Sequence, residues 1–339
     1  MRRMSGITVG ALVLGLGILA GSADAQDFSL KAKWVQTPPT LDGTVEGLWD
    51  QAPELTIPVS GGRNLLGGKT EVKLKAVYTS DRIFFLAKWK DASDSVRRSP
   101  YQKQADGSWV QLKDPNDKGG DNNLNYEDKF AMLWNINIAA VEKKGWMSVI
   151  QLGGGKPYGN KFAPEAGQHA DMWHWKRVRT GPVGQIDDQY LDGTRYDKEK
   201  SPEAGRKSDP KTSGGYADNK LVNGKPEWAL PGNRPASPYW ILDSEKVPFD
   251  DSKYKPGDEV PSIIIAPFTG DRGDISAQGV WKDGEWTLEF SRALTTQGEH
   301  DIQFNDLTKA YTFGVAVFDN AQVRHAFNPK PAKVTFEQR

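Results

Sequence analysis

The feature that most constrains the fold is a set of short segments in which apolar and polar residues alternate. The clearest is 72–78, and the more apolar 83–89 follows it after the turn pair Ser80-Asp81. Successive side chains of a strand point to opposite faces, so this pattern predicts a half-buried β-hairpin. Further strands are predicted at 128–138, 145–152, 262–266, 273–281, 286–294 and 312–318. Because almost no segment has helical periodicity, the chain is predicted to be an all-β protein built as a β-sandwich.

Residues 1–25 have the pattern of a secretory signal peptide. Arg2 and Arg3 supply positive charge, 7–20 is apolar, and Ala23-Asp24-Ala25 is a small-x-small cleavage site. The apolar run is short for a membrane span, and no other segment of the sequence approaches the required length. The mature chain is therefore expected to lack a membrane span and to work in the periplasm.

The composition excludes several classes of function. The sequence contains no cysteine, so an exported chain of this kind has no disulfides, no thiolate metal site and no haem attached through Cys-x-x-Cys-His. Basic and acidic residues both number 44, and no basic run points to nucleic acid or a membrane surface. No Ser-His-Asp signature or nucleophile elbow is present. The chain is therefore not expected to be an enzyme by itself.

Residues 26–339 are expected to form a single domain that carries one long insertion. The segment from about 191 to 257 is rich in Gly, Pro, Lys, Asp and Ser and has little periodicity. Because it is too long for an ordinary connection, it is predicted to be an irregular excursion that covers the domain or meets a partner.

The strand predicted at 170–176 has two different faces. A period of two places Trp173 and Trp175 on one face and Met172, His174 and Lys176 on the other. One interpretation is a packed sheet whose histidine is hydrogen-bonded. The other is the wall of a cofactor pocket, because thioether, imidazole and amine groups can all face a metal or an acidic group. The residues themselves are compatible with both.

Acidic turns indicate a second kind of site. Asp271-Arg272-Gly273-Asp274 and Asp187-Asp188 are candidates for calcium, because hard cations take several oxygen ligands. Paired acids also perform glycoside cleavage, but nothing in the sequence places two of them on opposite sides of one bond. Calcium is therefore a candidate cofactor.

Five segments follow one another in an order that resembles a known family. They are 41–49, 128–137, 171–176, 281–286 and 313–325. The order is similar to that of the haem-binding gamma subunit of ethylbenzene dehydrogenase and of related cytochrome c-552/DMSO reductase-like haem-binding domains. The Trp-His-Trp-Lys sequence is the most specific part, whereas Leu-Asp-Gly followed by Trp is shared with family 9 carbohydrate-binding modules. The resemblance covers nearly all of the mature chain.

This resemblance implies an immunoglobulin-like β-sandwich in the periplasm that holds one non-covalent b-type haem. Such subunits pass electrons between a molybdenum enzyme and a soluble cytochrome and leave catalysis to a partner. Trp173, His174, Trp175 and Lys176 would contact the haem, and Arg324 would pair with a propionate.

The resemblance also implies the axial ligands of the haem iron. In the family they are a methionine and, near the C-terminus, a lysine. The lysine falls where this chain has Arg324-His325-Ala326, so the expected ligand is His325, and imidazole is a routine ligand of haem iron.

The methionine of the family falls where this chain has Lys161-Phe162-Ala163. Three alternatives follow. Met147, or in second place Met172, substitutes for it; Lys161 itself ligates the iron; or the site has lost its haem.

Two other functions remain open. A carbohydrate-binding module would use exposed tryptophans as platforms, and a haem-free relative would keep the sandwich only as an interaction domain. A stack of exposed tryptophans on one flat face would favour sugar binding. An apolar slot between His325 and the 173–176 strand, roomy enough for a porphyrin, would favour haem.

Overall fold

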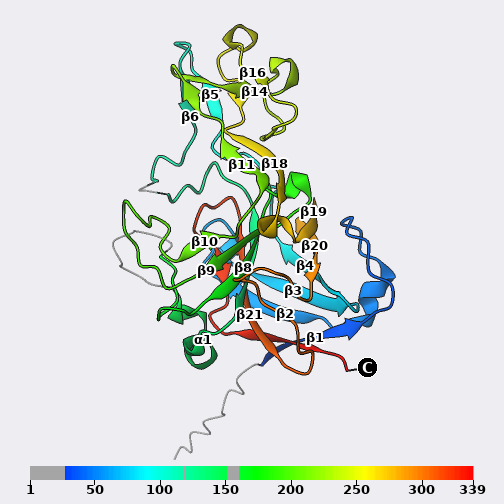
Figure 1. Cartoon of the computed structure of the whole chain (residues 1–339). Helices are drawn as coiled ribbons and strands as arrows, with labels where there is room; N and C mark the ends of the chain where they lie inside the picture. The colour runs from blue at the N-terminus through cyan, green and yellow to red at the C-terminus, as the bar shows by residue number, and fades with distance from the viewer. Residues whose placement is uncertain (1–26, 118–119, 151–159, 339) are drawn as a thin grey trace, which may run out of the picture.

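The computed structural model describes residues 27–117, 120–150 and 160–338. A thirteen-stranded sheet within these residues folds back on itself into two facing layers (Figure 1). One layer contains β2 (Leu55–Ser60), β3 (Lys69–Tyr78), β4 (Arg82–Lys90), β20 (Glu285–Ala293) and β19 (Ser276–Lys282). The other contains β10 (Arg206–Ser208), β9 (Asp187–Leu191), β8 (Ala170–Lys176), β7 (Lys129–Asn135), β21 (Tyr311–Phe318) and β22 (Ala326–Phe327).

The two layers are joined along one side by the ends of the chain. β23 (Ala332–Phe336) pairs antiparallel with β21 and parallel with β1 (Phe28–Trp34). β1 in turn pairs with β3 of the other layer. The predicted hairpin is β3 and β4, with Ala76 opposite Phe85. The all-β sandwich expected from the alternating segments is therefore confirmed.

Aromatic side chains fill the space between the layers. From β8, Trp173 lies 6.0 Å from Phe85 of β4, measured between ring centroids. Trp175 lies 5.0 Å from Trp286 of β20 and 6.4 Å from Trp89 of β4. Each large ring removes roughly 150–250 Å² from water, and edge-to-face pairs add directional attraction. The tryptophans of β8 thus pack the layer that contains β8 against the layer that contains β4 and β20.

The segment at 191–257, predicted to be irregular, contains short paired strands. β11 (Ser213–Asp218) and β15 (Ile241–Leu242) flank β18 (Ile263–Thr269). The other strands of this region are β12 (Leu221–Val222), β13 (Lys225–Pro226), β14 (Trp228–Ala229) and β16 (Val247–Pro248). Small apolar clusters, such as Trp109 with Phe249 and Tyr254, stabilise them without long alternating runs. Strands as short as these have no detectable period, which is why the sequence alone did not reveal them.

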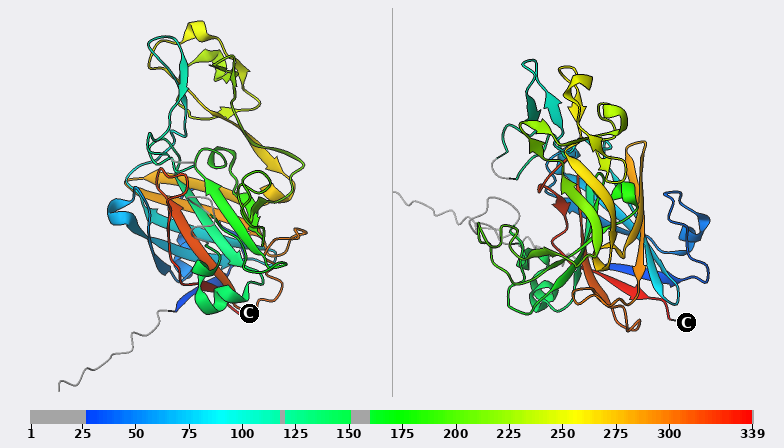
Figure 2. Two further views of the ribbon diagram at one scale, coloured as in Figure 1. Left: turned by 90° about the vertical axis from the view of Figure 1, so that its left-hand side faces the viewer. Right: turned by 45° about the horizontal axis from the view of Figure 1, so that its top comes forward.

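These short strands project from one end of the sandwich. β14 and β16 lie there beside β5 (Tyr101–Lys103) and β6 (Trp109–Gln111), and both views of Figure 2 show the projection. β17 (Glu259–Val260) pairs with β5 and so connects the insertion to the 101–111 hairpin.

Helical structure is limited to short pieces. α1 spans Ala139–Lys144. The 3₁₀ turns are η1 (Gly47–Gln51), η2 (Leu66–Gly68), η3 (Trp146–Ser148), η4 (Gly181–Val183), η5 (Pro231–Asn233), η6 (Asp251–Lys253) and η7 (Asp271–Gly273). None of the helices within 27–117, 120–150 and 160–338 is long and apolar enough to cross a membrane. The signal peptide predicted at 1–25 lies outside the described residues.

A strand predicted at 145–152 is wrong where the structure describes it. Gly145 has a positive φ of 73°, and a Cβ there would collide with the carbonyl of Pro329. Only glycine tolerates both constraints, so the chain turns after α1 and enters η3. Of the segment, Ile150 alone forms a β-bridge, with Lys161, among the described residues.

Candidate functional site

The outer face of β7, β8 and β21 forms the floor of a cavity of about 510 Å³. This volume lies within the range of typical small-molecule sites. Small residues create the space, because Ala131 of β7 lies directly opposite Ala316 of β21. Position 314 is a glycine, and a Cβ there would collide with the side chain of Trp146. The other floor residues are Leu133, Met172 and His174.

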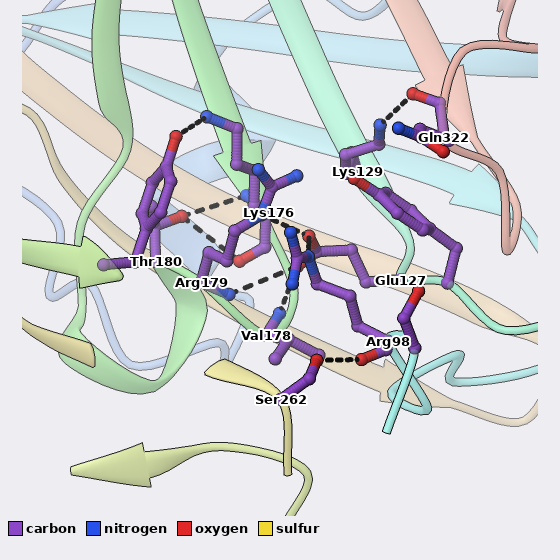
Figure 3. Close-up of polar contacts among 12 residues, drawn as sticks. Arg98, Glu127, Lys129, Lys176, Val178, Arg179, Thr180, Ser262 and Gln322 are labelled. Carbon is purple, nitrogen blue, oxygen red and sulfur yellow. Dashed lines mark hydrogen bonds and ion pairs between the residues drawn. The ribbon is translucent and has the colours of Figure 1, made fainter. Parts of the chain in front are cut away.

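One end of this cavity carries a cluster of cations. Lys129, Lys176, Arg179 and Arg206 all line it. Figure 3 shows Arg179 beside Glu127, with its Nε 2.5 Å from Glu127 Oε1. Three of these four cations come from two adjacent strands and the turn after β8, so the fold itself concentrates positive charge here.

Lys129 is the most constrained of the four. Its side chain is 2% exposed, and its Nζ donates a 2.8 Å hydrogen bond to the carbonyl of Gln322 (Figure 3). The same nitrogen lies 3.9 Å from the ring centroid of Phe318. Burial, and then the neighbouring Arg179, hold the pKa of Lys129 well below its usual range, although Glu127 opposes the shift. An anionic group in the cavity would relieve this cost.

His325 reaches the cavity from the connection between β21 and β22. Its Nδ1 lies 2.7 Å from the carbonyl oxygen of Val323. A carbonyl only accepts, so Nδ1 carries the proton and the lone pair is on Nε2. Burial, and then the charge of Lys161, lower the pKa of His325 to about 3. At neutral pH this side chain is therefore a neutral imidazole able to ligate a metal.

His174 supplies a second neutral imidazole on the cavity floor. Gln189 donates through its Nε2 to Ser208 and places its Oε1 3.1 Å from Nδ1 of His174. Nδ1 therefore donates, and the buried Nε2 has no hydrogen-bond partner in the part of the chain that the structure describes. Burial, and then Lys176 and Lys129, hold the pKa of His174 well below its usual range.

The structure brings only some of the predicted haem residues to one place. His325, Lys161, Met172, His174 and Lys176 all line the cavity. Lys161 precedes β8, the next three residues belong to β8, and His325 lies in the loop before β22. The resemblance implied haem contacts from these same segments. A cavity thus lies between His325 and β8, and its lining combines apolar side chains with several cations.

The other predicted residues lie elsewhere. Met147 is not a lining residue: η3 leaves its side chain 45% exposed, while Trp146 turns toward Gly314. Arg324 is in an ion pair with Asp121, 2.8 Å from Nη2 to Oδ2, and does not line the cavity.

Trp173 and Trp175 were also predicted to contact the cofactor. The structure places both in the core between the layers, because they alternate with the cavity-facing residues of β8. The period of two correctly placed the two tryptophans on a separate face from His174. Because that face is turned toward the core, neither tryptophan lines the cavity.

Sequence reasoning missed Lys129, Arg179 and Arg206. Lys129 had a detectable signal, since it is a charged residue at the start of the otherwise apolar segment 129–134. Arg179 and Arg206 had none, because a turn and a three-residue strand bring them to the cavity.

Comparison with known families supplies the assignment. A family model described as Ethylbenzene dehydrogenase matches residues 46–328. The chain belongs to the ethylbenzene dehydrogenase family. The resemblance inferred from the five ordered segments is therefore confirmed. The match spans all three strands of the cavity floor and the segment that carries His325.

The solved structures similar in fold to this family member include carbohydrate-binding proteins. A family 9 carbohydrate-binding module from Caldicellulosiruptor kristjanssonii, in complex with cellotriose, is 9% identical with a TM-score of 0.34. The alignment covers 92% of this chain and 94% of that one. A protein from Bacteroides uniformis proposed to bind carbohydrate is 10% identical, with a TM-score of 0.36 and coverage of 91% and 99%. None of the curated proteins compared matches the chain.

Proposed function

We propose that the protein is a non-catalytic electron-transfer subunit or carrier that holds one non-covalent b-type haem in this cavity. The observation that carries the proposal is the combination of a neutral imidazole, His325, with a buried cation cluster in one cavity of about 510 Å³. Membership of the ethylbenzene dehydrogenase family supports it. The haem would supply one-electron transfer, and the protein would set its potential through ligand identity and burial.

The residues present fit such a group. His325 would ligate the iron through Nε2, since its Nδ1 is held by the carbonyl of Val323. Lys161, in the place of the family methionine, is the proposed second ligand, and Met172 is the alternative on the floor. Lys129 and Arg179 lie at the cationic end, where they would pair with propionates.

The protein's own groups also prepare the site. Val323 fixes the tautomer of His325, and the ring of Phe318 lies 4.7 Å from its imidazole, which restricts its rotation. The carboxylate of Glu127 holds Arg179 in place, because it accepts hydrogen bonds from the backbone N–H and from Nε of Arg179. Preorganised ligands of this kind bind with less loss of conformational freedom.

The test is an absorption spectrum of the protein expressed with its leader and ample haem, before and after dithionite. Sharp α and Soret bands, with haem extractable by acidified acetone, are expected. His325→Ala should change or abolish these bands. His169→Ala is the matched control, because His169 does not line the cavity. A featureless visible spectrum of the wild type would refute haem binding.

Sugar binding has little support in the molecule. It requires exposed tryptophan platforms. The sequence has twelve tryptophans, and in the part of the chain that the structure describes none is among the exposed large apolar residues. The structural likeness to carbohydrate-binding modules has TM-scores of 0.34 and 0.36 and carries no argument for their ligands.

The proposed location is the periplasm, and the proposed partner is a molybdenum oxidoreductase or a soluble cytochrome. The projecting strands of 191–257 are the proposed contact surface, since Leu221 and Val222 are both exposed there. Leu221→Ser with Val222→Ser should abolish coelution of molybdenum with the protein and leave its absorption bands intact. Unchanged molybdenum coelution would refute this surface.

A further inference from the structure

Six carboxylates gather beside the sandwich core, on the face of β8 and β9 that is turned away from the cavity. Asp171 and Asp188 lie on these two strands, next to the core residue Trp173. The remaining four come from the segment after β10, from the connection between β18 and β19, and from the loop after β20. They are Asp209, Asp271, Asp274 and Asp301.

The carboxylate oxygens converge at two overlapping positions. One oxygen each of Asp171, Asp188 and Asp301 lie within 4.8 Å of one another. The same holds for Asp209, Asp271 and Asp301. Asp301 thus belongs to both groups, and the carboxylates form one continuous cluster.

Several of these oxygens lack the hydrogen bonds that burial normally requires. Asp188 is fully buried, yet neither of its carboxylate oxygens receives a hydrogen bond from an N–H or hydroxyl group within the described residues. Oδ1 of Asp171 and Oδ1 of Asp301 are in the same condition. Buried polar atoms are almost always satisfied in native proteins, so these oxygens require either a bound cation or protons shared between carboxyl groups, such as Asp188 and Asp274.

The hydrogen-bond donors that reach Asp171 all bind its other oxygen, Oδ2. Oδ2 of Asp171 accepts hydrogen bonds from Trp173 Nε1 at 3.0 Å, Arg292 Nη1 at 2.8 Å and Ile302 N at 2.8 Å. These bonds fix the orientation of Asp171 and leave its Oδ1 without a hydrogen-bond donor among the described residues.

The negative charge of the cluster is only partly compensated. Within the part of the chain that the structure describes, Arg292 is the cation in ion pairs with it, with its Nη1 2.8 Å from Asp171 Oδ2 and 3.7 Å from Asp301 Oδ2. One guanidinium thus faces six carboxyl groups. Burial raises the pKa of Asp171 to about 7, of Asp209 to about 8 and of Asp274 to about 6. Either shared protons or a bound cation must offset this repulsion.

We propose that Asp171, Asp188 and Asp301 bind a divalent cation of the calcium type. Calcium takes six to eight oxygen ligands, and carboxylates arriving from several chain segments are its usual protein ligands. Asp209 and Asp274 would complete the shell directly or through water. The cation would fasten the beginning of the insertion and the β18–β19 connection to the sandwich. This site is separate from the haem cavity, and the proposal does not depend on haem.

The test uses the full mature chain after EDTA treatment, with Ca²⁺ or Tb³⁺ as the probe. Ca²⁺ should raise the melting temperature in a concentration-dependent way, and Mg²⁺ should do so much less. Trp173 donates to Asp171, so excitation of tryptophan should sensitise Tb³⁺ emission, and Ca²⁺ should compete it away.

Asp188→Asn separates a cation site from a set of shared protons. Without calcium the variant should melt at a higher temperature than the wild type, because one buried negative charge is removed. The apparent calcium affinity, measured from the concentration dependence of the melting temperature, should be at least about tenfold weaker than in the wild type. Glu289→Gln is the matched control, since Glu289 is a buried carboxylate that accepts from Trp49 Nε1 and Gly43 N. It should lower the melting temperature and keep the calcium response.

The wild type alone can overturn the proposal. No calcium-dependent shift and no sensitised Tb³⁺ emission would show that the carboxyls share protons instead. An Asp188→Asn variant that keeps the full calcium shift would refute these ligands.

Discussion

Asp187 and Asp188 are adjacent on β9, yet their carboxylates lie on opposite faces of the sheet. Asp187 forms ion pairs with Lys176 of the cavity wall and with Arg272. Asp188 joins the buried acidic cluster on the core side. A single dipeptide therefore contributes one carboxylate to each of the two proposed sites.

Removing the Asp187 charge should destabilise the protein. Lys176 and Asp187 are both almost fully buried, and burial lowers the pKa of Lys176 to about 7 even though Asp187 opposes the shift. Asp187→Asn removes the carboxylate that Lys176 and Arg272 share. Breaking a pair of this kind costs about 3–5 kcal/mol. Urea unfolding at pH 7 measures the loss. Asp94→Asn, which breaks the more exposed pair with Arg177, is the control and should cost less than about 1 kcal/mol.

The same substitution should remove part of the acid sensitivity. Although burial opposes it, Lys176 and Arg272 hold the pKa of Asp187 below its usual value. A depressed carboxyl pKa stabilises the fold above about pH 4, and this contribution is lost as the pH falls further. Asp187→Asn should therefore lose less stability than the wild type below pH 4. Parallel pH profiles for the two proteins would contradict this role.

Lys129→Met should stabilise the haem-free protein at neutral pH and weaken haem binding. Because the pKa of Lys129 is depressed by burial, the unfolded chain binds an additional proton between the folded pKa and about pH 10.4. The unfolding free energy of the haem-free wild type should therefore rise with pH across this window, and the variant should lack that rise. The variant should also bind haem at least about tenfold more weakly, since a propionate loses its partner.

Haem titration followed at the Soret band gives the affinity, and urea unfolding at pH 7 and pH 10 gives the stability. Lys73→Met, at an exposed position of β3, should leave both quantities unchanged. Equal haem affinity in the wild type and Lys129→Met would exclude Lys129 from the propionate end.

Filling the cavity floor should block haem without unfolding the protein. Ala316 faces the cavity and lies opposite Ala131, so a leucine there occupies open space and not packed core. Ala316→Leu should reduce haem content by at least about tenfold and change the unfolding free energy by less than about 1.5 kcal/mol. The haem-to-protein absorbance ratio and a urea titration measure these effects. Ala166→Leu, at an exposed turn, should retain full haem content.

The sequence determines the two faces of β8 more directly than it determines the site. A period of two separates Trp173 and Trp175 from His174, and the structure has that arrangement. Met147 was a candidate ligand on the strand expected at 145–152, but Gly145 starts a turn there and the side chain of Met147 is exposed. Local patterns report the direction of neighbouring side chains only while the secondary structure is regular.

Contacts between distant segments had no local signal. Asp171 and Asp301 are 130 positions apart in the sequence. The sequence indicated Asp187 and Asp188 as one acidic pair, but of these two only Asp188 belongs to the cluster. Arg206 similarly reaches the cavity from a three-residue strand in the insertion. Such convergence depends on topology, which composition and spacing do not encode.

His325 should make the haem-free fold sensitive to acid and the haem-bound site resistant to it. Its pKa is lowered to about 3 by burial and by Lys161. An unfolded histidine titrates near pH 6.5, so the unfolded chain binds the extra proton between these two values. The unfolding free energy of the haem-free protein should therefore fall as the pH drops from about 6.5 toward 3. His325→Gln should flatten this part of the profile.

In the folded protein the imidazole remains neutral throughout that range, so protons do not compete with iron for Nε2 until the pH approaches 3. The absorption bands of the haem-loaded wild type should accordingly stay constant from pH 8 to about pH 5. His169→Gln, outside the cavity, should reproduce both wild-type profiles. Loss of the ligand-dependent bands with a midpoint near pH 6.5 would show that His325 is solvated, and would remove it as the axial ligand.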